Sequence, residues 1–300
     1  MSHPYGTERY AKSLPHVGTP FAVPEWDGHV LIRPVSGGHQ DAVGPYPVTA
    51  IMPDADVEAG LARLAAAGLV SIVLVVDDAL RPSMDALAAF DFATPFKTHH
   101  LHDRTLPFAY GKHHRYELKR ARGQVQAREI APPDHLDDWQ RLYGVLRERH
   151  DLSGVHAFPE THFRLLSELA GIRMFGAFAE NELVSAHLFV THDGHAISHL
   201  AASNARGYEL GAAYAVNDAA LESLDGCRTI NFGGGAGSGD DPSGGLARFK
   251  AGFSNRTASS LLCGKVLDRP AYEKLSAGAV TGDFFPAYRS LRKREHSDAD

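Results

Sequence analysis

The stretch from Ile172 to Asn204 constrains the fold more than any other part of the chain. Its sequence is IRMFGAFAENELVSAHLFVTHDGHAISHLAASN, in which apolar runs are separated by two short polar segments, ENEL and HDGH. Asn, Asp and Gly tolerate the backbone angles that a chain reversal needs, so both segments favour turns. The pattern predicts three consecutive strands joined by two turns, and the fold must accommodate that antiparallel sheet.

Helices and strands alternate before this sheet. Apolar residues at helical spacing predict a helix at 54–68 that ends at Gly68, and the β-branched run at 71–76 predicts a buried strand. Four more elements are expected before the sheet: a basic helix at 107–123, a strand at 125–130, a helix at 134–150 with Asp134 as its N-cap, and a helix at 159–171.

After the three strands, the sequence predicts a helix at 208–225, a strand at 227–232, a glycine-rich loop, a short helix and a strand at 258–266. The fold class is therefore α/β (α+β). A chain of 300 residues fits one large domain or two of about 150 residues, because single cores stop growing near 250–300 residues. The βαβ character of 54–76 favours two α/β halves.

Composition excludes several classes of function. The net charge is −6, so the whole chain is no generic polyanion binder, and any nucleic-acid contact must come from a local patch. Two cysteines, Cys227 and Cys263, are too few for a disulfide framework and fit a reducing compartment. The N-terminus lacks the apolar core of a signal peptide, and the apolar run at 69–76 is too short to span a bilayer. We expect a cytoplasmic globular protein.

The glycine-rich loop within 230–254 fits neither common nucleotide-binding motif. A P-loop needs Lys after its last glycine, whereas the first lysine after these glycines is Lys250. A dinucleotide fingerprint would need glycine where Asp240 stands, and the Asp240-Asp241 pair would repel a nearby phosphate. Two interpretations remain: a mobile surface loop, or a loop beside a reaction centre that positions the helix bearing Lys250.

The order of elements after residue 172 is that of a GNAT acyltransferase half. Several short runs also resemble the C-terminal half of Fem-type aminoacyltransferases and their GNAT-like relatives: Leu200–Asn204, Arg206-Gly207, Asn231–Gly235 and Leu246–Phe253, preceded by the basic helix and the segment Leu142–Leu166. The resemblance covers about 110–266. It implies two GNAT-like halves, each a mixed, mainly antiparallel sheet flanked by helices, at 1–108 and 109–290, followed by a disordered tail at 291–300.

The resemblance also implies the chemistry, which is transfer of an acyl or aminoacyl group from a carrier to an amine by direct attack. In the family pattern Lys250 lies near the reacting carbonyl and Phe249 helps to position it. A fixed cation there would stabilise the negative charge that develops on the carbonyl oxygen. The residues Gly233, Gly234, Gly235, Asp240 and Asp241 would form the substrate loop.

The identity of the donor stays open at this level. GNAT enzymes hold the pyrophosphate of coenzyme A in a loop at a helix N-terminus, and the corresponding residues here are Asn204, Arg206, Gly207 and Gly211. Glu209 stands where that loop has glycine, which would add negative charge against a phosphate. Acyl-CoA or an acyl carrier protein is the leading donor, with coenzyme A thioester as co-substrate and no tightly bound cofactor.

Aminoacyl-tRNA is the alternative donor. The helix KHHRYELKRAR places Lys112, Arg115, Lys119 and Arg122 on one face, which could contact tRNA phosphates. Of these, Arg115 and Lys119 are the candidate donor-binding residues. The acceptor would be a small-molecule or peptide amine.

Histidines supply the candidates for a general base. His187 and His199 lie on the predicted central strands, and an imidazole near its ordinary pKa could take a proton from an attacking amine. The histidines at 99–102 and 113–114 lack the Cys or acidic partners of a known metal motif, so no metal site is predicted. Two other classes remain open: a non-catalytic binding protein with a degenerate transferase fold, and an RNA-binding protein that uses 112–122.

Overall fold

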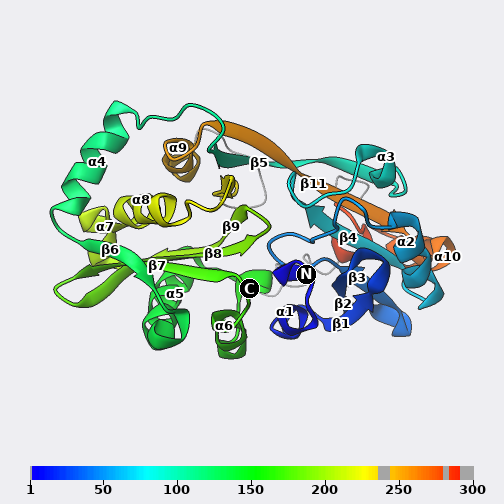
Figure 1. Cartoon of the computed structure of the whole chain (residues 1–300). Helices are drawn as coiled ribbons and strands as arrows, with labels where there is room; N and C mark the ends of the chain where they lie inside the picture. Colours follow the sequence, from blue (N-terminus) through cyan, green and yellow to red (C-terminus); the bar gives the residue numbers. More distant parts are fainter. Residues whose placement is uncertain (1, 236–243, 280–283, 291–300) are drawn as a thin grey trace. The chain divides into compact units, whose positions relative to one another are not determined.

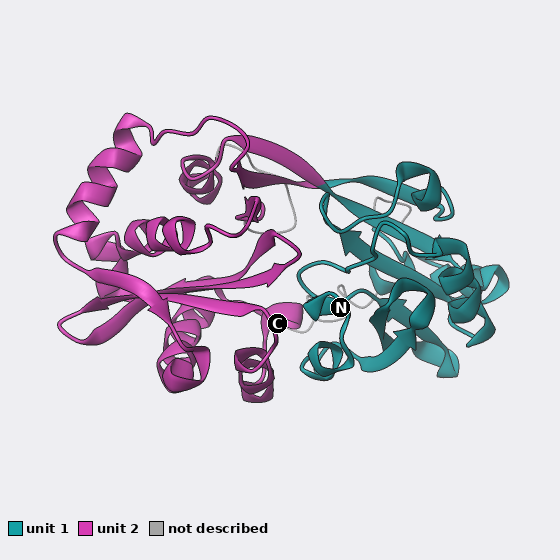
Figure 2. Ribbon diagram, in the orientation of Figure 1, with its two compact units in different colours: residues 1–96, 260–300 teal, residues 97–259 magenta. Residues whose placement is uncertain are grey.

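The computed structural model describes residues 2–235, 244–279 and 284–290. The chain divides into two compact units (Figure 2). Unit 1 comprises Met1–Phe96 and Ser260–Asp300, and unit 2 comprises Lys97–Ser259. The boundaries differ from those that we predicted, at 108 and 290. Residues from 260 onward belong with the N-terminal segment, because Leu261–Val266 pair antiparallel with Ser71–Val76.

Unit 1 contains a sheet in the order β1 (Thr19–Val23), β2 (Gly28–Pro34), β3 (Gln40–Val43), β4 (Ser71–Val76) and the C-terminal part of β11 (Arg256–Val266). Neighbours are antiparallel except β3 and β4, which are parallel and joined through α2 (Val57–Ala66). The predicted helix and strand of this region are confirmed. The remaining helices of this unit are α1 (Glu8–Lys12), α3 (Met84–Leu87) and α10 (Arg269–Ser276).

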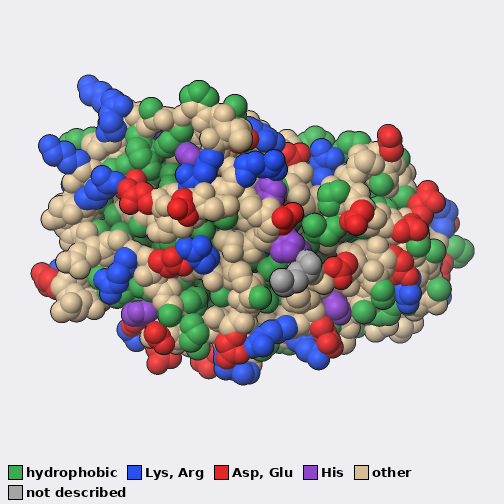
Figure 3. Space-filling view, in the orientation of Figure 1, with side chains coloured by type: hydrophobic (Ala, Val, Ile, Leu, Met, Phe, Trp, Pro, Cys, Tyr) green, Lys and Arg blue, Asp and Glu red, His purple; other side chains and the backbone are tan. Residues whose placement is uncertain are grey.

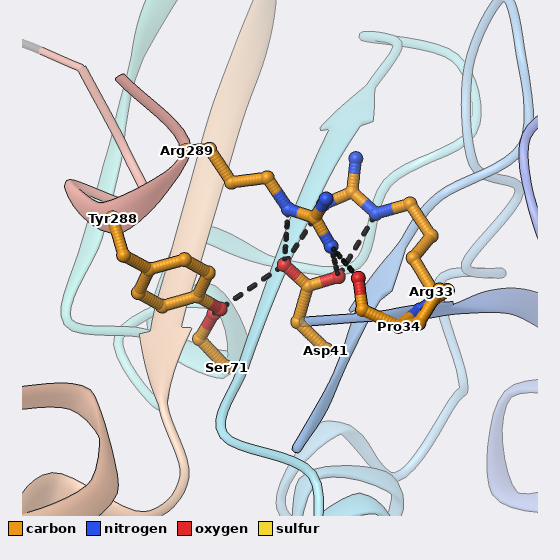
Figure 4. A network of polar contacts seen from close by, with 6 residues as sticks. All are labelled: Arg33, Pro34, Asp41, Ser71, Tyr288 and Arg289. Carbon is orange, nitrogen blue, oxygen red and sulfur yellow. Dashed lines mark hydrogen bonds and ion pairs between the residues drawn. The ribbon is translucent and has the colours of Figure 1, made fainter. Parts of the chain in front are cut away.

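A buried polar network fixes the segment around Tyr288 within unit 1 (Figure 4). The carboxylate of Asp41, which is fully buried, accepts hydrogen bonds from Arg33 and Arg289 at 2.7–3.1 Å. The Tyr288 hydroxyl donates to the same carboxylate at 3.0 Å and lies 2.8 Å from Ser71 Oγ. Two guanidinium groups and a hydroxyl therefore compensate one buried negative charge, which is what such a charge requires.

Unit 2 contains a mainly antiparallel sheet in the order β5 (Phe92–Asp103), β10 (Thr229–Asn231), β9 (His195–Ser203), β8 (Glu182–His192), β7 (Ile172–Ala179) and β6 (Gln126–Ile130). Only β9 and β10 are parallel. The strands β7, β8 and β9 form the predicted antiparallel sheet, and Glu180, Asn181 and Asp193 take positive φ in its turns.

Helices cover both faces of this second sheet (Figure 1). On one face α8 (Ala212–Ser223) packs on β6, β7 and β8, and on the other α5 (Leu136–His150) packs on β8 and β9. The remaining helices are α4 (Lys112–Arg122), α6 (Glu160–Ser167), α7 (Ala205–Leu210) and α9 (Gly245–Ala251). The α/β class with mainly antiparallel, helix-flanked sheets is thus confirmed. None of the described helices is long and apolar enough to cross a membrane.

Three local predictions were wrong in detail. The helix expected at 107–123 begins only at Lys112, and Asp134 lies in a short 3-10 turn ahead of α5 rather than capping it. The helix expected at 208–225 is two helices, because Gly211 takes a left-handed conformation (φ 64°) between α7 and α8. Glycine adopts that backbone region without steric cost, so the break falls there.

Candidate functional site

The glycines after β10 form a turn that lies along β5. Gly233 has φ +75°, and its carbonyl accepts a hydrogen bond from the His100 amide at 3.2 Å. A Cβ on Gly234 would lie 3.0 Å from the Thr98 carbonyl oxygen, so a side chain there would crowd β5. Gly233, Gly234 and Gly235 of the predicted substrate loop therefore pack against a strand. Asp240 and Asp241 lie outside the described residues.

Two lysine side chains end on this turn. Lys250 of α9 donates from Nζ to the Gly234 carbonyl at 2.6 Å, and Lys97 of β5 donates from Nζ to the Gly235 carbonyl at 3.2 Å. The two ammonium groups thus contact consecutive carbonyl groups of one turn. Sequence reasoning found Lys250 but missed Lys97, because nothing in the sequence of β5 distinguishes it from an ordinary strand lysine.

Aromatic packing holds the helix that carries Lys250. The Phe249 ring lies 4.9 Å from the Tyr214 ring and 5.1 Å from the Phe253 ring, centroid to centroid. The Phe249 carbonyl accepts a hydrogen bond from Nε2 of His114 at 3.0 Å. These contacts fix α9 against α4 and α8. Phe249 therefore positions α9 through packing, which agrees with a supporting role beside Lys250.

Burial and a neighbouring charge change the acidity of Lys250. Its side chain is half-buried, and desolvation lowers its pKa to about 8, with a smaller contribution from the charge of Lys97. The lysine is still mostly protonated at pH 7. It can therefore donate hydrogen bonds to an oxygen that becomes negative, and its two unused N–H groups supply the donors.

His187 is a buried structural residue in this structure. The Asn217 amide donates to the Ala213 carbonyl at 2.8 Å, so Asn217 Oδ1 accepts from Nδ1–H of His187 at 3.0 Å. Nε2 of His187 then accepts from the Ser198 hydroxyl at 2.7 Å. Desolvation, followed by the charge of Lys250, lowers its pKa to about 3. Both ring nitrogens are occupied, which does not favour the general-base role that we predicted.

His199 lies at an irregularity of β9. Leu188 of β8 pairs with Leu200, whereas the next residue, Phe189, pairs with Ser198, so His199 is the extra residue of a bulge. Its ring is buried 5.8 Å from the ring of His162 in α6. Burial, and then the neighbouring His162 and His187, lower its pKa well below the ordinary value. The structure does not bring this side chain into printed contact with Lys250.

Asn231 and two further histidines complete the surroundings of the turn. Asn231 Oδ1 accepts from the Gly233 amide at 2.7 Å, so its Nδ2 donates to Nδ1 of His99 at 3.0 Å. Burial, and then the charge of Lys97, lower the pKa of His156. Sequence reasoning assigned no role to Asn231 or His156. The run Asn231–Gly235 was visible in the sequence as part of the resemblance, but His156 carried no signal.

The predicted phosphate loop, 204–211, is occupied by the protein's own groups. Asn204 caps α7, because its Oδ1 accepts from the Gly207 amide at 2.8 Å, and its Nδ2 donates to Glu182 at 2.9 Å. Arg206 forms ion pairs with Glu180 at 3.1 Å and Glu182 at 4.0 Å. The arginine expected to bind pyrophosphate thus lies between two carboxylates.

The two glycines of the same loop serve packing and direction. A Cβ on Gly207 would lie 2.1 Å from the Val184 carbonyl oxygen, so α7 approaches β8 more closely than another residue would allow. Gly211 provides the left-handed break described above. Glu209 is exposed. Each glycine has a structural reason that does not depend on a bound phosphate.

The basic face of α4 is only partly available. Lys112, Arg115 and Lys119 are exposed, although Arg115 also donates to the Tyr110 carbonyl at 2.6 Å. Arg122 instead pairs with the nearly buried Asp218 of α8. Figure 3 shows several Lys and Arg side chains at the upper left, where Figure 1 places α4. Three cations therefore remain for an anionic ligand.

No metal site is evident in the part of the chain that the structure describes, since no group of three or more His, Cys, Asp or Glu side chains there could hold a metal ion. Both cysteines are buried and unpaired with each other. Burial raises the pKa of each thiol, to about 11 for Cys263. A nucleophilic cysteine would need the opposite shift.

Comparison with known proteins agrees with this architecture. Residues 112–250 match the family model described as an acetyltransferase (GNAT) domain. The structure of FemX superposes with a TM-score of 0.62 at 13% identity, over 91% of this chain and 95% of that one. L-PGS from Bacillus licheniformis gives 0.59 at 14% identity, over 88% and 92% of the two chains. No curated protein matches the sequence significantly.

The chain has the fold of the GNAT/Fem-like acyltransferase superfamily. A third structure, the C-terminal domain of a putative lysylphosphatidylglycerol synthetase from Agrobacterium fabrum, superposes with a TM-score of 0.56 at 16% identity over 81% of both chains. The match to the GNAT model runs from the start of α4 to Lys250, so it contains both the loop at 204–211 and the glycine turn. The resemblance that we drew from short sequence runs is confirmed at the level of fold.

Proposed function

We propose that the protein transfers an acyl or aminoacyl group from a carrier to an amine by direct attack. The observation that carries the proposal is Lys250, a half-buried cation that aromatic packing holds at the glycine turn of a GNAT-type domain. The neutral amine attacks the carbonyl carbon, and the carrier leaves as a thiolate or an alcohol. The amine proton passes to solvent or to the leaving group.

Lys250 stabilises the negative oxygen of the tetrahedral intermediate. One fixed donor of this kind is worth about 10²–10³ in rate in other acyl transfers. Neither buried histidine of β8 and β9 serves as a base in this scheme, since both are kept neutral and His187 is bonded at both nitrogens. The acceptor must therefore arrive as a free amine or lose its proton late in the reaction.

Two observations favour a donor other than coenzyme A held at 204–211. Asn204 occupies the Gly207 amide and Arg206 is paired with carboxylates, so a pyrophosphate would have to displace both arrangements. The exposed cations of α4 instead suit a larger phosphate-bearing carrier, with aminoacyl-tRNA as the one we propose first. Acyl-CoA and acyl carrier protein are the competing donors.

A donor screen tests the proposal. The purified protein is incubated with acetyl-CoA or with mixed aminoacyl-tRNA and a set of small amines, and transfer is followed by mass spectrometry. We expect transfer with aminoacyl-tRNA, loss of at least 100-fold in Lys250→Met, and no change in Lys274→Met, which alters an exposed lysine of unit 1. Transfer from acetyl-CoA would overturn the donor choice.

Calorimetric titration of coenzyme A at low and moderate salt separates the remaining cases. Binding without transfer from either donor would favour a non-catalytic binding protein. Combined substitution of Lys112, Arg115 and Lys119 by Gln should weaken tRNA binding and flatten its dependence on salt, because each phosphate contact releases counterions. Unchanged tRNA binding in that variant would remove α4 from the donor site.

A further inference from the structure

The lysine pair at the glycine turn is a concentration of positive charge built from two elements. Lys97 lies on β5, and Lys250 lies on α9, more than 150 positions later in the chain. Because their ammonium groups donate to the consecutive carbonyls of Gly234 and Gly235, both charges lie at one place. A lysine that only anchors the turn would not require a second lysine beside it.

The groups around the pair do not neutralise it at Lys250. Among the described residues, no carboxylate forms an ion pair with Lys250, and its printed polar contact is the Gly234 carbonyl. The histidines nearby add no negative charge. His187 is bonded through both nitrogens to neutral groups, His99 accepts from Asn231, and His156 is a weaker base than usual because of burial and Lys97.

We propose that Lys97 and Lys250 together bind an anionic group of the acceptor, a carboxylate or a phosphate, next to the reacting carbonyl. The acceptor is then an amine with an acidic group close to its amino group, such as an amino acid or a phosphorylated amine. Its role as acceptor rests on the proposed function, whereas anion binding by the two lysines does not.

The hydrogen-bond capacity of Lys250 allows both tasks. An ammonium group has three N–H donors, and the Gly234 carbonyl takes one. One of the others faces the developing oxyanion and the third shares the acidic group with Lys97. An anion at this place also offsets the repulsion between the two cations, which a neutral amine would leave uncompensated.

Titration of simple anions tests the site without any turnover. Inorganic phosphate and acetate are titrated at pH 7 and constant ionic strength, because salt screens exposed charges. We expect millimolar binding of at least one anion, weakened about tenfold or more in Lys97→Met and in Lys250→Met, and unchanged in Lys274→Met. Binding of phosphate alone or of acetate alone identifies the acidic group.

Two results would overturn the proposal: no binding of either anion by the wild type, or equal affinity in the wild type and both site variants. Chemical labelling provides a readout that does not depend on the folding of a variant. Phosphate or acetate should protect Lys97 and Lys250, but not Lys274, from an amine-modifying reagent in the wild-type protein. Equal labelling with and without the anion would also contradict the site.

Once a transferable amine is known, Lys97 can be tested separately from Lys250. Lys97→Met should raise KM for an acidic acceptor at least tenfold with a smaller effect on kcat, and Lys97→Arg should restore KM. Lys250→Met should instead lower kcat. Loss of transfer in Lys250→Met with intact anion binding would leave the proposed function standing and remove the anion site.

Discussion

Two charged clusters of this protein follow opposite rules. In unit 1 the buried Asp41 carboxylate is matched by Arg33, Arg289 and Tyr288, so charge and hydrogen bonds are complete within the protein. In unit 2 Lys97 and Lys250 meet at backbone carbonyls, and no described carboxylate pairs with Lys250. The first arrangement needs nothing more to be stable. The second becomes favourable when negative charge arrives, which is how a site differs from a structural network.

Removal of the acid from the complete cluster should have the largest effect. Asp41→Ala leaves two buried guanidinium groups without a counter-charge, and we expect a loss of about 3–5 kcal/mol in the free energy of unfolding of unit 1. Urea denaturation checks this, with the exposed Asp54→Ala as the control, for which less than about 0.5 kcal/mol is expected. Equal stability of the two variants would mean that the network is not a net constraint.

Removal of the cation from the incomplete cluster should affect catalysis. Lys250→Met is expected to lower the rate of acyl transfer about 100-fold, which corresponds to roughly 2.7 kcal/mol of transition-state stabilisation. The wild-type rate should also fall as the pH passes about 8, where Lys250 loses its proton. Steady-state rates between pH 6 and 9 test both statements, and an undiminished rate at pH 9 would contradict them.

The neutral histidine beneath the site makes stability depend on pH. The folded-state pKa of His187 is about 3, below its ordinary value near 6.5, so the unfolded chain binds the proton first as the pH falls. Stability is therefore lost from about pH 6.5 downward, by roughly 2 kcal/mol between pH 6.5 and 5 from this residue. Urea denaturation at pH 7 and 5 should show a smaller loss in His187→Gln than in the wild type. Equal losses would show that His187 is not the cause.

The smallest expected effect has the opposite sign. Because the half-buried Lys250 is charged at pH 7 and its folded-state pKa is lowered to about 8, the folded state carries a desolvation cost. Lys250→Met should therefore raise the free energy of unfolding by about 1 kcal/mol at pH 7. The gain should shrink as the pH rises from about 8 toward 10.5, where the wild-type lysine is neutral in both states. A destabilised variant at pH 7 would show that the Gly234 hydrogen bond outweighs the desolvation cost.

The sequence predicted most of the sheet of unit 2 and one half of the lysine pair. Alternating apolar runs and turn residues are local signals, so β7, β8 and β9 were predictable. The pairing of Leu261–Val266 with β4 was not, because contacts between segments nearly 200 residues apart leave no periodic trace. Lys97 was missed for the same reason, since its meaning depends on the distant Gly235. Arg206 shows the reverse: its position suggested phosphate, and only the structure reveals Glu180 and Glu182 beside it.

The chain passes between the units within β5 and again within β11, so unit 2 is continuous and unit 1 is not. On a ribosome, residues 97–259 emerge before β11 is available to pair with β4. Unit 2 can therefore complete its sheet first, although the N-terminal strands were synthesised earlier. Those strands must wait with an unpaired β4 edge until the last part of the chain is translated, which makes them the segment most exposed to chaperones and to aggregation.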